Sequence, residues 1–337
     1  MIRTILLRLL SALPSLAGVV VITFLLTRAL PGDPAAFFAG MAATPEAVEQ
    51  VREKLGLNRS LPEQFVRYLR DLARGDLGQS LSTGQPVLQE IATRLPASLE
   101  LTLAALLLAC AIALPLGVLA ATRPGSWIDH GCRLITTAGV SLPTFFTGLL
   151  LAYVFYFKLG WAPAPLGRLD PVYSPPATVT GAYLIDSLLA RDGEVFVAAL
   201  RQLVLPTFTM ALFVLAPLAR MTRASMLGVL SADFVRTARA SGLTRTTVLW
   251  TYAFRNALLP IVTTLGMVFS FLLGSNVLVE KVFAWPGIGS FAVEALIASD
   301  FAPVQGFVLT MAILYVLLNL GIDLLNRAID PRARRAA

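Results

Sequence analysis

Residues 98–122 read SLELTLAALLLACAIALPLGVLAAT and hold a single charged side chain, that of Glu100. A hydrocarbon core about 30 Å thick needs about 20 apolar residues at about 1.5 Å rise each, so this stretch predicts a helix that spans a bilayer. Five further stretches of the same kind lie at 9–29, 134–157, 203–218, 258–279 and 304–325. The sequence is 56% hydrophobic and only 14% charged. It therefore predicts an all-α polytopic membrane protein with six transmembrane helices.

The positive residues behind the net charge of +7 are segregated along the chain. Between the fourth and fifth spans, arginines far outnumber the one acid, Asp233, and further arginines lie at the N-terminus and after the last span. The last loop of the opposite face instead sets Lys281 against Glu280, Glu294 and Asp300. Because Lys and Arg concentrate in cytoplasmic loops, both termini are predicted to be cytoplasmic. This topology explains the basic pI better than nucleic-acid binding does.

The polar stretches between the spans predict smaller units. An extracytoplasmic helical cap is expected from three amphipathic segments, 45–55, 62–75 and 86–95. A proline-rich extracytoplasmic insert is expected at 158–202, with a short helix at 182–189. The chain thus divides into a first transmembrane helix, a cap, a transmembrane domain and a cytoplasmic tail, at 1–29, 30–97, 98–327 and 328–337. Prolines inside the spans are expected to bend them: Pro115, Pro143, Pro206 and Pro217.

The stretch SADFVRTARASGLTRTTVLWTYAFRNALLP, residues 231–260, predicts two helices joined at a glycine corner on the cytoplasmic face. Ser231 or Asp233 can cap the first helix. Gly242 suits the left-handed C′ position that ends it. Thr244 can cap the second helix, which continues towards the fifth span.

The first helix of this loop has one distinctive side. Phe234, Ala238 and Ser241 share it, at helical spacing. Positive-inside topology explains the arginines of the loop but not a short, capped helix with such a face. The design suits insertion into a groove on another protein.

At this point the chain resembles ABC-transporter permeases, whose coupling loop carries Glu-Ala-Ala, three residues and Gly. Arg236, Thr237 and Ala238 occupy the first three places and Gly242 the last, so the Glu and one Ala are absent. The resemblance is closer to the dipeptide, oligopeptide and nickel branch. The motifs that carry it are VRTARASGL at 235–243, RNALLP at 255–260, LPGDP at 30–34, LGL at 55–57, GDLGQS at 75–80, RLPASLELT at 94–102, VFAWPGIG at 282–289, NLGIDLL at 319–325 and IDPR at 329–332.

Two segments narrow the resemblance. The PGDP segment at 31–34 is typical of the first of the two paired permeases in that branch, so this chain resembles the first and not the second. The insert, with GAYLID at 181–186 and RDGEVF at 191–196, looks most like the dipeptide member.

The resemblance implies a type I ABC importer permease fold in a bacterial inner membrane, which imports dipeptides or short peptides by alternating access. The implied partners are a second homologous permease, two cytoplasmic ABC ATPase subunits and an extracytoplasmic solute-binding protein. The chain itself is expected to bind no cofactor, with ATP and Mg on the ATPase subunits. The residues expected to couple to those subunits are Asp233, Arg236, Thr237, Ala238, Arg239, Gly242, Arg255 and Pro260. The residues expected on the translocation path are Asn276, Glu280, Asn319 and Asp323. A lone chain is expected to leave pore-facing polar groups such as Asn276, Glu280 and Asn319 against lipid, and a second permease would cover them.

Other classes of activity have less support. None of the three lysines, Lys54, Lys158 and Lys281, stands in a Walker A loop, and the single histidine, His130, excludes an HExxH metal site. A secondary, ion-coupled transporter keeps ionisable groups at mid-membrane, whereas these spans are almost free of charge, with Asp323 the clearest exception. A membrane enzyme would need a nucleophile or paired acids at depth, and no convergent set is present. Within the family, import of oligopeptides, nickel or another small solute is the alternative.

Overall fold

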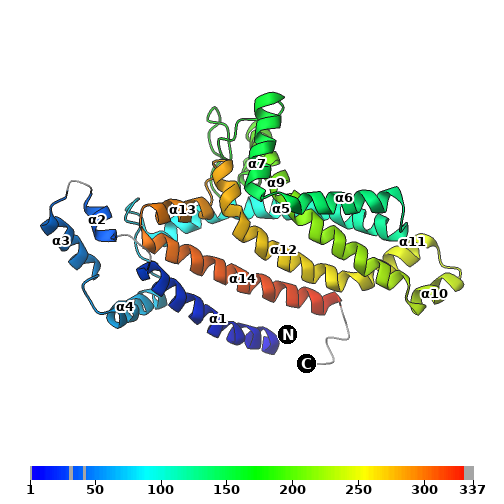
Figure 1. The fold of residues 1–337 in the computed structure, drawn as a ribbon, viewed down its shortest axis with the longest axis horizontal. Helices are drawn as coiled ribbons and strands as arrows, with labels where there is room; N and C mark the ends of the chain where they lie inside the picture. The colour runs from blue at the N-terminus through cyan, green and yellow to red at the C-terminus, as the bar shows by residue number, and fades with distance from the viewer. Residues whose placement is uncertain (1, 30–32, 41–42, 330–337) are drawn as a thin grey trace. The chain divides into compact units, whose positions relative to one another are not determined.

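The computed structural model describes residues 2–29, 33–40 and 43–329. Within these residues the chain is almost entirely helical, and the only β pairing is one isolated bridge between Gln79 and Pro86 (Figure 1). The described residues include five helical runs that are long and apolar enough to cross a membrane. These runs lie in α1 (Ile2–Ala29), α5 (Val87–Thr122), α9 (Gly193–Leu230), α11 (Arg245–Thr247) continuing through η2 (Val248–Phe254) into α12 (Arg255–Val282), and α14 (Phe301–Ile329).

The third predicted span, 134–157, is wrong as a single helix. It is divided between α6 (Trp127–Ser141) and α7 (Thr144–Leu151), and α7 continues into the π-helical segment η1 (Ala152–Lys158). The break falls at Pro143, which lacks an N–H and disfavours helical geometry in the residue before it. Leu142 is accordingly extended, with ψ 141°. By contrast, α9 runs unbroken through Pro206 and Pro217.

The cap contains α2 (Pro34–Ala39), α3 (Pro45–Leu55) and α4 (Leu61–Ala73). As predicted, α3 begins at Thr44, whose hydroxyl accepts the Ala47 N–H at 3.4 Å. The separate cap helix predicted at 86–95 is wrong, because residues 87–95 form the first turns of α5. No glycine stop follows them, so the helix continues into the second span. The helix predicted at 182–189 is present as α8 (Tyr183–Leu189).

The chain divides into two compact units. Unit 1 holds the described residues up to Ser98 together with Pro286–Val316, which include α13 (Ile288–Ile297). Its core joins Val87 and Ile91 to Ile288 and Phe291. Close packing is possible there because Gly306 has no side chain. A Cβ at this position would lie 2.6 Å from Val87 Cγ1.

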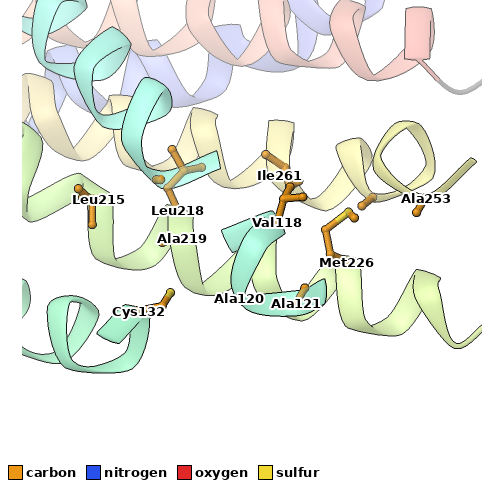
Figure 2. Packing of buried hydrophobic residues seen from close by; sticks show 12 residues of the cluster. Val118, Ala120, Ala121, Cys132, Leu215, Leu218, Ala219, Met226, Ala253 and Ile261 are labelled. Carbon is orange, nitrogen blue, oxygen red and sulfur yellow. The ribbon is translucent and has the colours of Figure 1, made fainter. Parts of the chain in front are cut away.

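Unit 2 holds Leu99–Trp285 and the described residues from Leu317 onward. Its core is built from α5, α6, α9, η2 and α12, and many of its members are alanines (Figure 2). Small side chains let helix backbones approach closely, which is how helices associate in membranes. At Gly117 the backbone of α5 lies against the backbone of α9, since a Cβ there would lie 2.8 Å from the Ala219 carbonyl oxygen. This core supports the loop between α9 and α12.

Candidate functional site

The helix α10 (Asp233–Ala240) follows α9 at one end of unit 2 (Figure 1). Its N-cap is Ala232, which offers no side-chain acceptor. Capping by Ser231 or Asp233 is therefore wrong. Ser231 instead donates to the Gly228 carbonyl at 2.9 Å and ends α9, and Asp233 is the first residue inside α10.

The end of α10 is the glycine corner that the sequence predicts. Gly242 has φ +77°, in the left-handed region. Its N–H donates to the Arg239 carbonyl at 3.1 Å, and the Leu243 N–H donates to the Ala238 carbonyl at 3.4 Å. These two bonds make up a Schellman motif, which satisfies carbonyls left open at a helix end. The C′ position of Gly242 is confirmed.

The second helix of the loop has its N-cap at Thr244, two residues after Gly242. The Thr244 hydroxyl accepts the Thr247 N–H at 3.3 Å, so Thr244 is the predicted N-cap. The helix then passes through the wider turns of η2, where the Asn256 side chain donates to the Tyr252 carbonyl at 2.7 Å. Arg255 and Pro260 are exposed on the helix that follows. Single π-helical segments of this kind occur often at functional sites.

A small apolar cluster holds α10 in place. Val235 and Ala238 are buried against Val248 of η2, with Val229 and Leu230 of α9 packed beside them. The position of α10 therefore depends on the ends of both long helices. Movement of either helix would move α10.

The other side of α10 is open to solvent. Arg236, Thr237 and Arg239 are exposed there, and Arg236 pairs with Asp233 at 3.4 Å. Such an exposed pair contributes little to stability. These side chains are free to meet another surface.

A shallow groove of about 460 Å³ runs along α10. Phe234, Ala238 and Ser241, the predicted face, all border it, and Tyr252 of η2 lines the other side. The groove combines apolar surface with hydroxyl groups at its rim. It can receive an apolar side chain from a partner.

A buried ionic centre between α6 and α9 was missed by the sequence analysis. Asp129 of α6 is fully buried and accepts two hydrogen bonds from Arg223 of α9, at 2.5 and 2.9 Å. Arg133 and the Gly125 N–H each donate to it at 3.0 Å. The available signal was a lone acid between Arg123 and Arg133, in a stretch whose other charges are basic.

A second buried pair fixes the insert. Arg168 donates to Glu100 of α5 at 2.6 Å, and both side chains are less than a tenth exposed. Glu100 also accepts the Leu184 N–H at 2.8 Å, and the Arg168 guanidinium lies 3.6 Å from the centre of the Tyr183 ring. The one charge in the stretch 98–122 thus anchors the insert to α5.

The residues expected on the translocation path divide into two kinds. Asn276 and Glu280 of α12 are buried inside unit 2, at 2% and 0% exposed, and Asn276 donates to Thr102 at 3.2 Å. The expectation that a lone chain leaves these two against lipid is wrong, since the chain itself covers them. Asn319 and Asp323 of α14 are half-buried.

Comparison with known proteins gives two family models that match most of the chain. The one described as "Binding-protein-dependent transport system inner membrane component" matches residues 113–335. Its N-terminal companion, described as "Binding-prot-dependent transport system membrane comp, N-term", matches residues 1–102.

Curated relatives match over nearly their whole length. The probable D,D-dipeptide transport system permease protein DdpB of Escherichia coli is 48% identical over 95% of this chain and 94% of its own. The di/tripeptide transport system permease protein DppB of Pseudomonas aeruginosa is 42% identical over 96% of both chains. The dipeptide transport system permease protein DppB of Escherichia coli is 38% identical over 99% of both chains.

Proposed function

This chain belongs to the inner membrane components of binding-protein-dependent transport systems, and from that premise we propose that it is the permease subunit of an ATP-driven importer of dipeptides or similarly short peptides. As a permease of this family it is a non-catalytic, multi-pass membrane subunit without a cofactor of its own. The observation that carries the substrate proposal is its identity of 48%, 42% and 38% to relatives whose names specify dipeptide or di/tripeptide transport. Import of oligopeptides, nickel or another solute is the competing assignment.

The loop 231–260 is proposed to couple this subunit to separate ATPase subunits. The groove along α10 offers apolar contact, and Arg236 and Arg239 beside it offer charge. The buried side of α10 packs on α9 and η2, so a displacement of α10 would be transmitted to the two long helices that these segments belong to. Coupling requires an element with two states whose equilibrium is shifted both by the ATPase subunits and by the translocation path.

The proposed assembly contains a second homologous permease, two cytoplasmic ATPases that bind ATP and Mg, and an extracytoplasmic binding protein. Both termini and α10 would then lie in the cytoplasm, and residues 30–97 and 158–202 outside, as the arginine distribution supports. The division at 1–29, 30–97, 98–327 and 328–337 belongs to the same proposal.

Asn319 and Asp323 are proposed to line the translocation path. Asn276 and Glu280 would join them only if α12 separates from its neighbours during the cycle, because both are buried. Alternation between two packings of the same helices would provide that exposure.

The test is growth of a strain that lacks this chain on a dipeptide as sole nitrogen source, with nickel uptake and growth on longer peptides measured beside it. The proposal expects loss of dipeptide use and its restoration by the wild-type chain. Loss of nickel uptake with dipeptide use intact would overturn the substrate assignment. Uptake by the reconstituted assembly that needs a proton gradient and ignores ATP would instead identify a secondary transporter.

A further inference from the structure

A second hollow, of about 500 Å³, lies in unit 2 between the first turns of α9 and the insert segment that contains Asp170 and Tyr173. Its volume is in the range of sites for small ligands. Glu194, Val197, Arg201 and Gln202 of α9 line it, at the i, i+3, i+7 and i+8 spacing that places side chains on one helix face. The hollow is separate from the groove along α10.

Gln202 provides the strongest indication of a ligand. Its side chain is only 5% exposed, and its Nε2 donates to no acceptor within the described part of the chain. A buried donor without an acceptor loses its hydrogen bond to water and gains none in return, so native structures rarely leave one unused. An acceptor on a bound molecule would satisfy it.

Three charged side chains line the hollow: Glu194 and Arg201 of α9, and Asp170 of the insert, whose carboxylate accepts the Val172 N–H at 3.0 Å. Glu194 and Arg201 stand seven residues apart on α9, about 10 Å along the helix axis at 1.5 Å per residue. Neither forms an ion pair with another residue that the structure describes. Along α9, the donors of Arg201 and Gln202 stand about two helical turns from the Glu194 carboxylate, and all three side chains line the hollow.

We propose that this hollow binds a free short peptide by its two charged ends, with the α-carboxylate on Arg201 and Gln202 and the α-ammonium on Glu194. Val197 lies between them along α9 and also lines the hollow, so it would meet the side chains of the ligand. Two extended residues span about 7 Å, which the Arg and Glu side chains can bracket across two turns of helix. The inference rests on the proposed function and adds a peptide site on the chain outside the translocation path.

The experiment measures binding of alanyl-alanine by calorimetry to the purified assembly in nanodiscs, without the binding protein. Arg201→Gln should weaken binding about tenfold, since a charge-assisted hydrogen bond contributes about 1.5 kcal/mol. Alanyl-alanine amide, which lacks the carboxylate, should bind the wild-type protein about tenfold more weakly than alanyl-alanine does. Arg201→Gln should weaken binding of the amide little further, because the same contact is already lost. Glu194→Gln and acetyl-alanyl-alanine, which lacks the ammonium group, should show the same relationship at the other end of the peptide.

Arg191→Gln is the matched control, because Arg191 is an exposed arginine of the same insert that does not line the hollow. Gln202→Leu gives a second readout. It should weaken binding while thermal stability holds or rises, because an unsatisfied buried amide is replaced by an apolar group. If Gln202 had only a structural role, Gln202→Leu would lower the thermal stability of the protein instead.

Unchanged binding in Arg201→Gln and Gln202→Leu, or equal loss in Arg191→Gln, would overturn the site. No binding by an assembly that still transports dipeptides with its binding protein would overturn the site and leave the proposed function standing. Specific binding by an assembly that transports no dipeptide would overturn the proposed function and leave the site.

Discussion

Arg223 of α9 donates two hydrogen bonds to the carboxylate of Asp129 of α6, from Nε to Oδ1 at 2.5 Å and from a terminal nitrogen to Oδ2 at 2.9 Å. The two residues are 94 positions apart in the sequence. Asp129 is fully buried and Arg223 about one-fifth exposed. The pair joins the start of α6 to the part of α9 that leads into α10. It therefore fixes α6 against the last third of α9, the helix that precedes the loop proposed to couple to the ATPase subunits.

Asp129→Asn should lower the thermal midpoint of the purified chain markedly, because it leaves Arg223 facing a neutral partner in a buried site. Asp233→Asn is the matched control, since the Asp233 side chain is 97% exposed and its pair with Arg236 is solvated. Tryptophan fluorescence on heating would measure both. Equal midpoints for the two variants would contradict a structural role for the pair.

The pH dependence of this effect follows from the pKa of the Asp129 carboxyl, which the Arg223 hydrogen bonds, the Gly125 N–H and Arg133 hold below its usual value. A carboxyl whose pKa is lower in the folded state stabilises the fold above its unfolded value of about 3.9. That contribution is lost as the pH falls through the folded-state pKa. The difference in midpoint between wild type and Asp129→Asn should stay constant from about pH 8 to about pH 5 and shrink below about pH 4. A difference that changes between pH 8 and 6 would point to another group.

Gly242→Val should impair transport more than membrane insertion. Nothing lies within 4 Å of a Cβ built on Gly242, so the cost is backbone strain at φ +77° and not a clash. A residue with a side chain pays about 1–2 kcal/mol in the left-handed region, and a β-branched one more. Membrane level and peptide-stimulated ATP hydrolysis of the assembly would be measured together.

Gly228→Val is the control for that variant, since it also adds a side chain in open space but in ordinary helical backbone. Gly242→Asn should retain most of the activity, because Asn tolerates left-handed geometry. Wild-type transport by Gly242→Val would refute the coupling role of the corner.

Gly117→Ala should destabilise unit 2. The added methyl would lie 2.6 Å from Thr222 Cβ and 2.8 Å from the Ala219 carbonyl oxygen, and a backbone oxygen cannot rotate away. Overpacking of this kind costs about 1–3 kcal/mol. Gly274→Ala has nothing within 4 Å and should be neutral or stabilising, since Ala favours helix. Detergent unfolding curves would show the difference, and similar curves would exclude a close α5–α9 contact.

The topology is testable with single cysteines in a chain whose Cys110 and Cys132 are replaced. Cysteine at Gln50 or Leu188 should react with an impermeant thiol reagent added outside intact cells, and cysteine at Thr246 should not. All three positions are exposed, so protection reports the membrane side and not burial. Ser187, the neighbour of Leu188, is unsuitable because it is fully buried. Labelling at Thr246 without labelling at Gln50 would invert the orientation.

Some of these features could be predicted from the sequence because their causes are local. The span 98–122 follows from the length of an apolar run, and the corner at Gly242 follows from the one residue type that adopts positive φ at little cost. Thr244 begins the second helix because its hydroxyl reaches an N–H three residues ahead. The corner and the N-cap depend on neighbours within one or two turns, and the span depends on the composition of one continuous stretch.

Other features depended on contacts between distant residues. The arginines that flank the predicted spans look alike in sequence, yet only the fold brings Arg223 to Asp129. The single acid of span two meets Arg168 only because the insert folds back onto α5. The burial of Asn276 and Glu280 likewise depended on which helices cover α12. Sequence alone determined five of the six predicted spans, the corner and the family resemblance. Tertiary packing decided which polar groups are paired, buried or open to a ligand, since that choice depends on distances between helices far apart in the chain.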